Sequence, residues 1–164
     1  MLILTTGGTI DKIYFDATSK YEIGEPTIPH IFKEAGVTVP YQLVSLLQKD
    51  SLEMTDEDRA LLHKHCSETA ESQILITHGT DTICETAEYL QDIPHKTIVL
   101  TGALAPARFR ETDAIFNIGT ALGAVQSKTH GVYVAMSGHI FPAGSVRKNR
   151  EAQCFEPITP LPLA

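Results

Sequence analysis

Short apolar segments alternate with amphipathic segments along this chain, and the alternation restricts the fold more than any other feature. The strand candidates are residues 2–6, 41–46, 73–77, 97–101 and 131–135. Each is short and rich in residues that favour strands, as expected of strands buried on both faces. Helical segments between such strands predict an α/β fold, a doubly wound and mostly parallel sheet with helices on both faces.

Four helices are predicted, at residues 27–35, 56–69, 81–90 and in a stretch that ends near Ser127. Thr55 is expected to cap the second helix, whose first turn is acidic, and Gly36 follows the end of the first. The third and fourth helices each carry one apolar stripe that can pack on the sheet. The stripes are Ile83, Cys84, Ala87 and Leu90, and Ile115, Ile118, Leu122 and Val125.

The length of 164 residues fits one domain with an apolar core, which we place at residues 1–156, followed by a tail at 157–164. The formal net charge is −7, with scattered basic residues, and this argues against nucleic acid as a partner. No apolar run approaches the ~20 residues of a membrane span, so no membrane partner is expected.

The three cysteines are Cys66, Cys84 and Cys154, and their wide spacing predicts buried free thiols instead of disulfides or a zinc site. Met1 is followed at once by the strand candidate 2–6, which leaves no room for a signal peptide. We therefore expect a cytoplasmic protein.

Polar clusters follow four of the predicted strands. They are Gly7-Gly8-Thr9, Asp50-Ser51, His78-Gly79-Thr80-Asp81 and Gly102-Ala103. Ligands of open α/β sheets bind beyond the carboxyl ends of the strands, so we expect these clusters to converge on one crevice.

The first cluster is ambiguous by itself. Two glycines permit a sharp turn and a close backbone approach, and Thr9 then presents a hydroxyl group. A tight turn is the simpler interpretation. A dinucleotide site is excluded because GxGxxG is absent, and a P-loop is excluded because no GK[ST] follows.

In the third cluster, Gly79 and Thr80 are expected to open a helix whose free N–H groups favour an anion. From the residues alone, a helix cap is the better interpretation of Thr80, and Asp81 is either a partner of the helix dipole or a charged catalytic residue. A hydroxyl nucleophile also needs a base, for which Tyr21, Asp81 and Lys148 are candidates. Lys148 could instead be an ordinary solvated lysine.

Metal binding is not indicated. The histidines His78, His130 and His139 have no spacing typical of metal ligands.

Taken together, Thr5-Thr6-Gly7-Gly8-Thr9-Ile10 and His78-Gly79-Thr80-Asp81-Thr82 resemble the paired threonine signatures of bacterial-type L-asparaginases. The resemblance continues through residues 50–55, 100–103, 113–117 and 146–148, and covers roughly residues 1–156. Because two signatures occur in the correct order, the match is specific.

This resemblance implies that Thr9 attacks the side-chain amide carbon of the substrate, forming a covalent acyl-enzyme and releasing ammonia. It implies that Tyr21, on a mobile loop within a Tyr-x-x-Gly motif, helps to activate Thr9. Thr80, Asp81 and Lys148 resemble the second catalytic group, which assists proton transfer and attack by water.

The resemblance also implies the substrate contacts. Ser51 and the backbone N–H groups near Gly8 and Gly79 would bind the α-carboxylate, and Asp81 would pair with the α-ammonium. The carbonyl of Ala103 would face the leaving nitrogen. Neither a cofactor nor a metal is implied.

The expected protein is a short-form L-asparaginase that acts as a homodimer or homotetramer on a small amino-acid substrate. Two alternatives remain open at this point. One is a non-catalytic amino-acid-binding module with a retained pocket, and the other is an amidase acting on glutamine or another amide. Leu52, where some secreted members have a polar residue, leaves the choice between asparagine and glutamine undecided.

Overall fold

A six-stranded sheet forms the centre of the computed structural model, which describes residues 1–16 and 19–158. The spatial order is β4 (Gln42–Lys49), β1 (Leu2–Gly7), β5 (Gln73–Thr77), β6 (Thr97–Thr101), β7 (Gly131–Met136) and β8 (His139–Pro142). The first five are parallel, and only β8 runs antiparallel to its neighbour in this sheet. The predicted mostly parallel sheet is confirmed.

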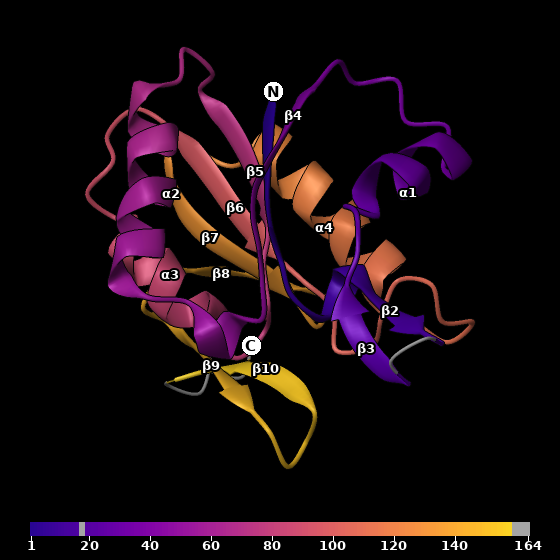
Figure 1. Ribbon diagram of the computed structural model, residues 1–164. Helices are drawn as coiled ribbons and strands as arrows, with labels where there is room; N and C mark the ends of the chain where they lie inside the picture. Colours follow the sequence, from indigo (N-terminus) through magenta and orange to yellow (C-terminus); the bar gives the residue numbers. More distant parts are fainter. Residues whose placement is uncertain (17–18, 159–164) are drawn as a thin grey trace.

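Helices cover both faces of this sheet, which confirms the doubly wound architecture (Figure 1). The helices are α1 (Ile28–Glu34), α2 (Asp56–Glu68), α3 (Ile83–Tyr89) and α4 (Ala114–Ser127). Helices α2 and α3 lie on one face, and α1 and α4 lie on the other. Two 3₁₀ turns follow the strands, η1 (Thr9–Asp11) after β1 and η2 (Ser51–Glu53) after β4.

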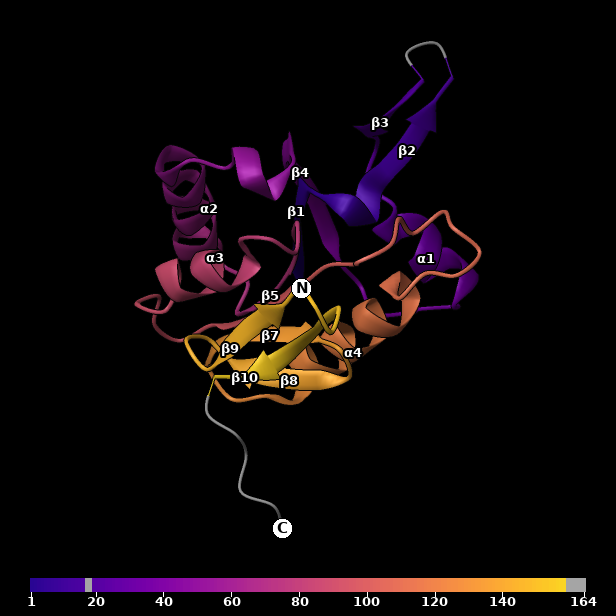
Figure 2. The same ribbon diagram turned by 90° about the horizontal axis from the view of Figure 1, so that it is seen from below.

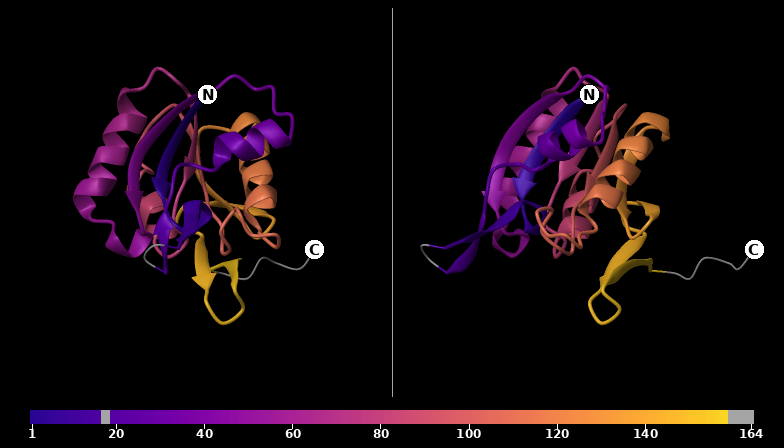
Figure 3. Two further views of the ribbon diagram at one scale, coloured as in Figure 1. Left: turned by 45° about the vertical axis from the view of Figure 1, so that its right-hand side comes forward. Right: turned by 90° about the vertical axis from the view of Figure 1, so that its right-hand side faces the viewer.

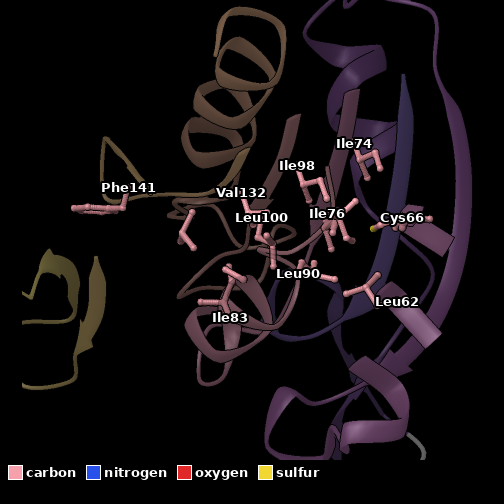
Figure 4. Close-up of a cluster of buried hydrophobic side chains, with 14 of the residues drawn as sticks. Leu62, Cys66, Ile74, Ile76, Ile83, Leu90, Ile98, Leu100, Val132 and Phe141 are labelled. Carbon is pink, nitrogen blue, oxygen red and sulfur yellow. The ribbon is translucent and has the colours of Figure 1, made fainter. Parts of the chain in front are cut away.

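The strands β1 and β6 are buried along their whole length, as their apolar sequences predict. Alternate residues of the central strands point to the two faces, so each face has its own core cluster. Figure 4 shows the cluster beneath α2 and α3, in which Leu62 and Cys66 of α2 approach Ile74 and Ile76 of β5.

Local sequence signals explain two of the helix boundaries. Thr55 caps α2 in a full capping box, because its hydroxyl accepts from the Asp58 N–H while the Asp58 carboxylate accepts from the Thr55 N–H. Gly36 follows α1 with a φ of +64°, a conformation in which a side chain is disfavoured. Both predictions are confirmed.

The prediction for α4 was partly wrong. Ile115 is 54% exposed, whereas Ile118 and Val125 are buried. The face toward the sheet is completed instead by Ala114, Asn117, Ala121 and Ala124. Small side chains allow the helix to approach the sheet closely, so the buried stripe is offset from the line of large apolar residues.

Three further pieces of β structure were not predicted: the edge strand β8 and two small antiparallel pairs. One pair is β2 (Lys12–Phe15) with β3 (Lys20–Ile23), and the other is β9 (Val146–Asn149) with β10 (Cys154–Pro157). Both pairs project beyond the carboxyl edge of the sheet (Figures 2 and 3). The predicted tail at 157–164 begins inside β10, where Pro157 pairs with Val146, and residues 159–164 lie outside the described residues.

The strand order reverses between β1 and β5, because the chain passes from β1 out to β4 and then returns to β5. In open α/β sheets such a reversal leaves a crevice beyond the strand ends. The loops after β1 and β5 therefore meet at this point.

Buried titratable side chains fix both loops. His78 is fully buried, and its Nδ1–H donates to the Gly79 carbonyl at 2.7 Å while Nε2 accepts from the Thr86 hydroxyl at 2.9 Å. Burial lowers the pKa of His78 to about 4, so the ring is neutral. Asp11 accepts from the Thr27 N–H at 2.8 Å, and burial raises the pKa of its carboxyl to about 6.

Core packing beneath α2 is tested by two neighbouring leucines. Leu62 is completely buried, whereas Leu61 is 39% exposed. Leu62→Ala is expected to lower the free energy of unfolding by about 3 kcal/mol, because it removes buried apolar area and leaves a cavity. Leu61→Ala, measured in the same urea titration, should lower it by less than about 1 kcal/mol. Equal losses would contradict this packing.

His78 and Asp11 should have opposite effects on the pH dependence of stability. The folded pKa of His78 lies below its ordinary value of 6.5, so its contribution is lost as pH falls from 6.5 to 4, by about 3 kcal/mol. The folded pKa of Asp11 lies above its ordinary 3.8, so its contribution is lost as pH rises from 4 to 6.

The variants His78→Gln and Asp11→Asn separate these effects in urea titrations at pH 4, 5 and 6. Relative to the wild type, stability should fall more steeply with rising pH in His78→Gln and rise more steeply in Asp11→Asn. Slopes that match the wild type in both variants would show that neither group titrates as proposed.

Candidate active site

Glycine backbones bring the loops after β1, β4 and β5 into direct contact. Gly8 has a φ of +88°, and a Cβ atom there would overlap the backbone of Gly79. A Cβ atom on Gly79 would lie 2.5 Å from the Ser51 Oγ. Because side chains cannot fit at either position, only glycine permits this close approach.

The loop after β6 completes the cluster. A Cβ atom on Gly102 would overlap the His78 carbonyl, and Ala103 beside it is fully buried. The Asn117 amide of α4 donates to the Gly102 carbonyl at 3.0 Å, and the Asp113 carboxylate accepts from the Leu104 N–H at 2.9 Å. The structure thus brings all four predicted polar clusters together.

Thr80, Asp81 and Lys148 form one polar network although β9 is far from β5 in sequence. The Lys148 Nζ donates to the Thr80 Oγ1 at 2.7 Å and to the Asp81 Oδ1 at 3.0 Å. The Lys148 side chain is only 17% exposed, so it is not an ordinary solvated lysine. A lysine bonded to both a hydroxyl and a carboxylate can pass a proton between them.

The interpretation of Thr80 as a helix cap is wrong, as is the prediction that Gly79 and Thr80 open the helix. Helix α3 begins at Ile83, and its N-cap position is Thr82. The Thr82 hydroxyl donates to the Ser51 carbonyl at 2.9 Å. The residues between β5 and α3 form turns, which leave Thr80 directed to Lys148.

Thr9 is the first residue of η1 and directly follows the Gly8–Gly79 contact. Its side chain is half-buried, and its hydroxyl makes no hydrogen bond within residues 1–16 and 19–158. Thr9 follows Gly8 and Thr80 follows Gly79 in the sequence. The two threonines therefore flank one backbone contact.

Ser51 is buried at the start of η2, with its hydroxyl directed to the loop after β5. The Ser51 Oγ accepts from the Asp81 N–H at 3.2 Å. Asp50 before it accepts from the Lys12 Nζ at 2.7 Å, and this bond is the main cause that lowers the pKa of the Asp50 carboxyl. Lys12 thus ties the β2–β3 hairpin to the Ser51 turn.

Tyr21 is the predicted residue that the structure does not bring to Thr9. It lies on strand β3 and not on an irregular loop, and its side chain is 53% exposed. Its ring packs against Tyr14 and Phe109, and within the described residues its hydroxyl makes no hydrogen bond with Thr9. Tyr21 also lines a cavity of about 380 Å³ together with Lys12 and Asp50.

Arg150 was missed by the sequence analysis. Its Nη2 lies 3.0 Å from the Asp81 Oδ1, the same oxygen that accepts from Lys148. The spacing of Lys148 and Arg150, two residues apart at the end of a strand, is typical of side chains on one face and could have indicated it. Asp81 therefore sits between two cations.

Within residues 1–16 and 19–158, no group of three or more His, Cys, Asp or Glu side chains could hold a metal ion. No helix there has the length and apolarity to cross a bilayer.

Comparison with known proteins identifies the family. The model of the asparaginase N-terminal domain matches residues 1–164. The glutaminase-asparaginase of Acinetobacter glutaminasificans is 30% identical over an alignment 166 residues long. This alignment covers 90% of this chain and 49% of that protein. The L-asparaginase of Thermococcus kodakarensis is 31% identical over 160 residues, covering 90% of this chain and 47% of that protein.

Solved structures of L-asparaginases have a fold similar to that of this chain. The thermostable L-asparaginase from Thermococcus kodakarensis superposes with a TM-score of 0.84 at 28% identity, covering 96% of this chain and 50% of that one. A probable cytoplasmic L-asparaginase from Campylobacter jejuni gives a TM-score of 0.79 at 30% identity, covering 95% and 52%. The chain spans about half the length of these relatives. Because the family model matches the whole chain, the protein belongs to the asparaginase family, in the part that corresponds to its N-terminal domain.

Proposed function

We propose that the protein is an amidohydrolase that converts L-asparagine to L-aspartate and ammonia through a threonine acyl-enzyme. The observation that carries the proposal is the Thr80–Lys148–Asp81 network beside the loop of Thr9. A half-buried hydroxyl that has no hydrogen-bond partner among residues 1–16 and 19–158, next to a hydroxyl held by a lysine, suits acyl transfer.

In the first step the Thr9 oxygen attacks the side-chain amide carbon of the substrate. A C–O bond forms as the C–N bond breaks, and the hydroxyl proton passes to the leaving nitrogen.

In the second step water hydrolyses the Thr9 ester. Thr80 orients the water, and Lys148 and Asp81 exchange its proton, since the lysine ammonium contacts both side chains. Aspartate leaves and the Thr9 hydroxyl is restored.

The substrate is held at its two charged ends. Ser51 and the neighbouring backbone N–H groups take the α-carboxylate, and Asp81 takes the α-ammonium. Fixing both charges decides which carbonyl meets Thr9. The carbonyl of Ala103 accepts from the leaving amide nitrogen, and the site uses neither a cofactor nor a metal.

Tyr21 reaches Thr9 only after the β2–β3 hairpin moves. Its ring now packs on Tyr14 and Phe109 at the surface, and such exposed contacts are weak enough to exchange. Closure of the hairpin over a bound substrate would bring the Tyr21 hydroxyl to the nucleophile and exclude water.

We further propose that the chain acts in the cytoplasm as a homodimer or homotetramer. The cavity that Tyr21 lines with Lys12 and Asp50 lies at the β2–β3 hairpin, and a second copy packed there would cover it.

Two threonine substitutions test the mechanism through ammonia release from L-asparagine. Thr9→Ala should lower kcat by at least about a thousandfold, because it removes the nucleophile, and Thr80→Ala by about a hundredfold or more. Thr120→Ala serves as the control, because its hydroxyl donates to the Phe116 carbonyl within α4. Unchanged activity in both site variants would refute the mechanism.

The same assay separates the alternatives. Asparagine binding without turnover by the wild type would instead identify a non-catalytic binding module. L-Glutamine is the second candidate substrate, because one relative is named a glutaminase-asparaginase. Turnover of glutamine without asparagine would move the protein to that substrate class.

The assembly proposal predicts a solution mass that is two or four times the chain mass of 17.9 kDa. Light scattering coupled to size-exclusion chromatography measures it directly. A monomer that nevertheless releases ammonia from asparagine would show that no second copy is needed.

A further inference from the structure

A cavity of about 620 Å³ lies on the face of the sheet that α1 and α4 cover, between α1 and the loop after β6 (Figure 1). We call it the α1 cavity. None of the proposed catalytic or substrate-binding residues is among its described lining residues, and its volume is that of an ordinary small-molecule site. The lining includes Pro26, Ile31, Arg108, Phe109, Arg110 and Ile115.

Two arginines of this lining differ from the other three in the chain. Arg59, Arg147 and Arg150 each pair with a carboxylate. Arg108 and Arg110 make no hydrogen bond or ion pair within residues 1–16 and 19–158. Because the chain has 20 acidic and 13 basic residues, carboxylate partners are not scarce. Two unpaired guanidinium groups in one cavity therefore indicate a site for an anion that the chain does not itself supply.

The carboxylates nearest to the α1 cavity are bonded elsewhere. The Asp11 carboxylate accepts from the Thr27 N–H at 2.8 Å, and Arg108 acts on it only through space. The Glu34 carboxylate of the lining lies 3.4 Å from the Nε2 of His30 on the same helix. Both guanidinium groups are therefore left without a bonded carboxylate.

Hydrogen bonds hold the loop that carries the two arginines. The Phe109 N–H donates to the Pro106 carbonyl at 3.0 Å. The Thr112 hydroxyl donates to the Ala105 carbonyl at 3.1 Å. The two arginines lie two residues apart on this loop and line the same cavity, so both can reach one ligand. A phosphate monoester matches them, because it has nearly two negative charges near neutral pH and accepts from both guanidinium forks, whereas one carboxylate balances only one cation.

Large apolar side chains form the other wall of the α1 cavity. Ile115 and Phe109 line it although they are 54% and 44% exposed, and Ile31 and Pro26 lie on the opposite side. An apolar ligand body placed between them would remove this surface from water. An aromatic body would also pack favourably against the Phe109 ring. The wall thus accounts for the position of Ile115 outside the stripe that packs on the sheet.

We propose that the α1 cavity binds a small phosphate monoester with an aromatic body. The phosphate lies between Arg108 and Arg110, and the aromatic ring packs against Phe109. The inference is independent of the proposed function, because this binding requires neither Thr9 nor the Thr80–Lys148–Asp81 network.

The experiment is isothermal titration calorimetry with phenyl phosphate as the probe, in a buffer free of phosphate at about pH 7.5, where the probe is mainly a dianion. The wild type should bind it with a Kd below about 1 mM. Arg108→Gln and Arg110→Gln should each raise this Kd by about tenfold, because each removes a charged donor. Arg147→Gln is the matched control, since it changes the net charge equally but lies outside the cavity, and should change the Kd by less than about twofold.

Two further probes test the chemistry of the ligand. Benzoate keeps the ring with a single negative charge, and orthophosphate keeps the phosphate without the ring, so each should bind at least about tenfold more weakly than phenyl phosphate.

Four results would overturn the inference. They are no binding of phenyl phosphate by the wild type, an unchanged Kd in both cavity variants, an equal loss of affinity in Arg147→Gln, and binding of benzoate or orthophosphate as tight as that of phenyl phosphate. Because the titrations record binding alone, any of these leaves the proposed function standing. Failure to hydrolyse asparagine would equally leave this inference standing.

Discussion

The backbone contact between Gly8 and Gly79 is the constraint on which the rest of the site depends. A side chain at either position would overlap the neighbouring loop, so the ends of β1 and β5 can meet only because both residues are glycine. The strand reversal between β1 and β5 creates the crevice. The Gly8–Gly79 contact lies at its base, where the loops after the two strands meet. As a result, Thr9 and Thr80 lie on either side of one junction while Ser51 packs against Gly79.

Ion pairs hold the two small hairpins to the loops that meet at the Gly8–Gly79 contact. Asp81 lies between Lys148 and Arg150, and both cations come from the β9–β10 pair beyond the carboxyl edge of the sheet. This pairing attaches the small hairpin to the loop after β5, because charge-assisted bonds in a partly buried site are strong. The other hairpin is tied to the site by the Lys12–Asp50 bond. These bonds thus attach two peripheral strand pairs to the loops that the central sheet positions.

Much of the fold could be predicted, because β1, β5 and β6 each hold three consecutive large apolar residues and α2 has a complete capping signal. The edge strand β8 was missed although the two-residue turn Ser137-Gly138, with both φ angles positive, is typical of a hairpin. The offset of the α4 stripe depends on how closely small residues approach the sheet, which periodicity does not report. Arg150 was missed because pairing with Asp81 depends on the tertiary position of a hairpin, and the exposed position of Tyr21 depends on ring contacts with Tyr14 and Phe109.

The proposed mechanism requires that Thr9 becomes covalently attached to the acyl group of the substrate. Rapid acid quench of the wild type mixed with asparagine, followed by peptide mass mapping, measures this attachment directly. We expect an aspartyl group on the peptide that contains Thr9, and no such group on that peptide in Thr9→Ala. An aspartyl group on Thr80 instead, or ammonia release with no adduct on either threonine under conditions that trap esters, would contradict it.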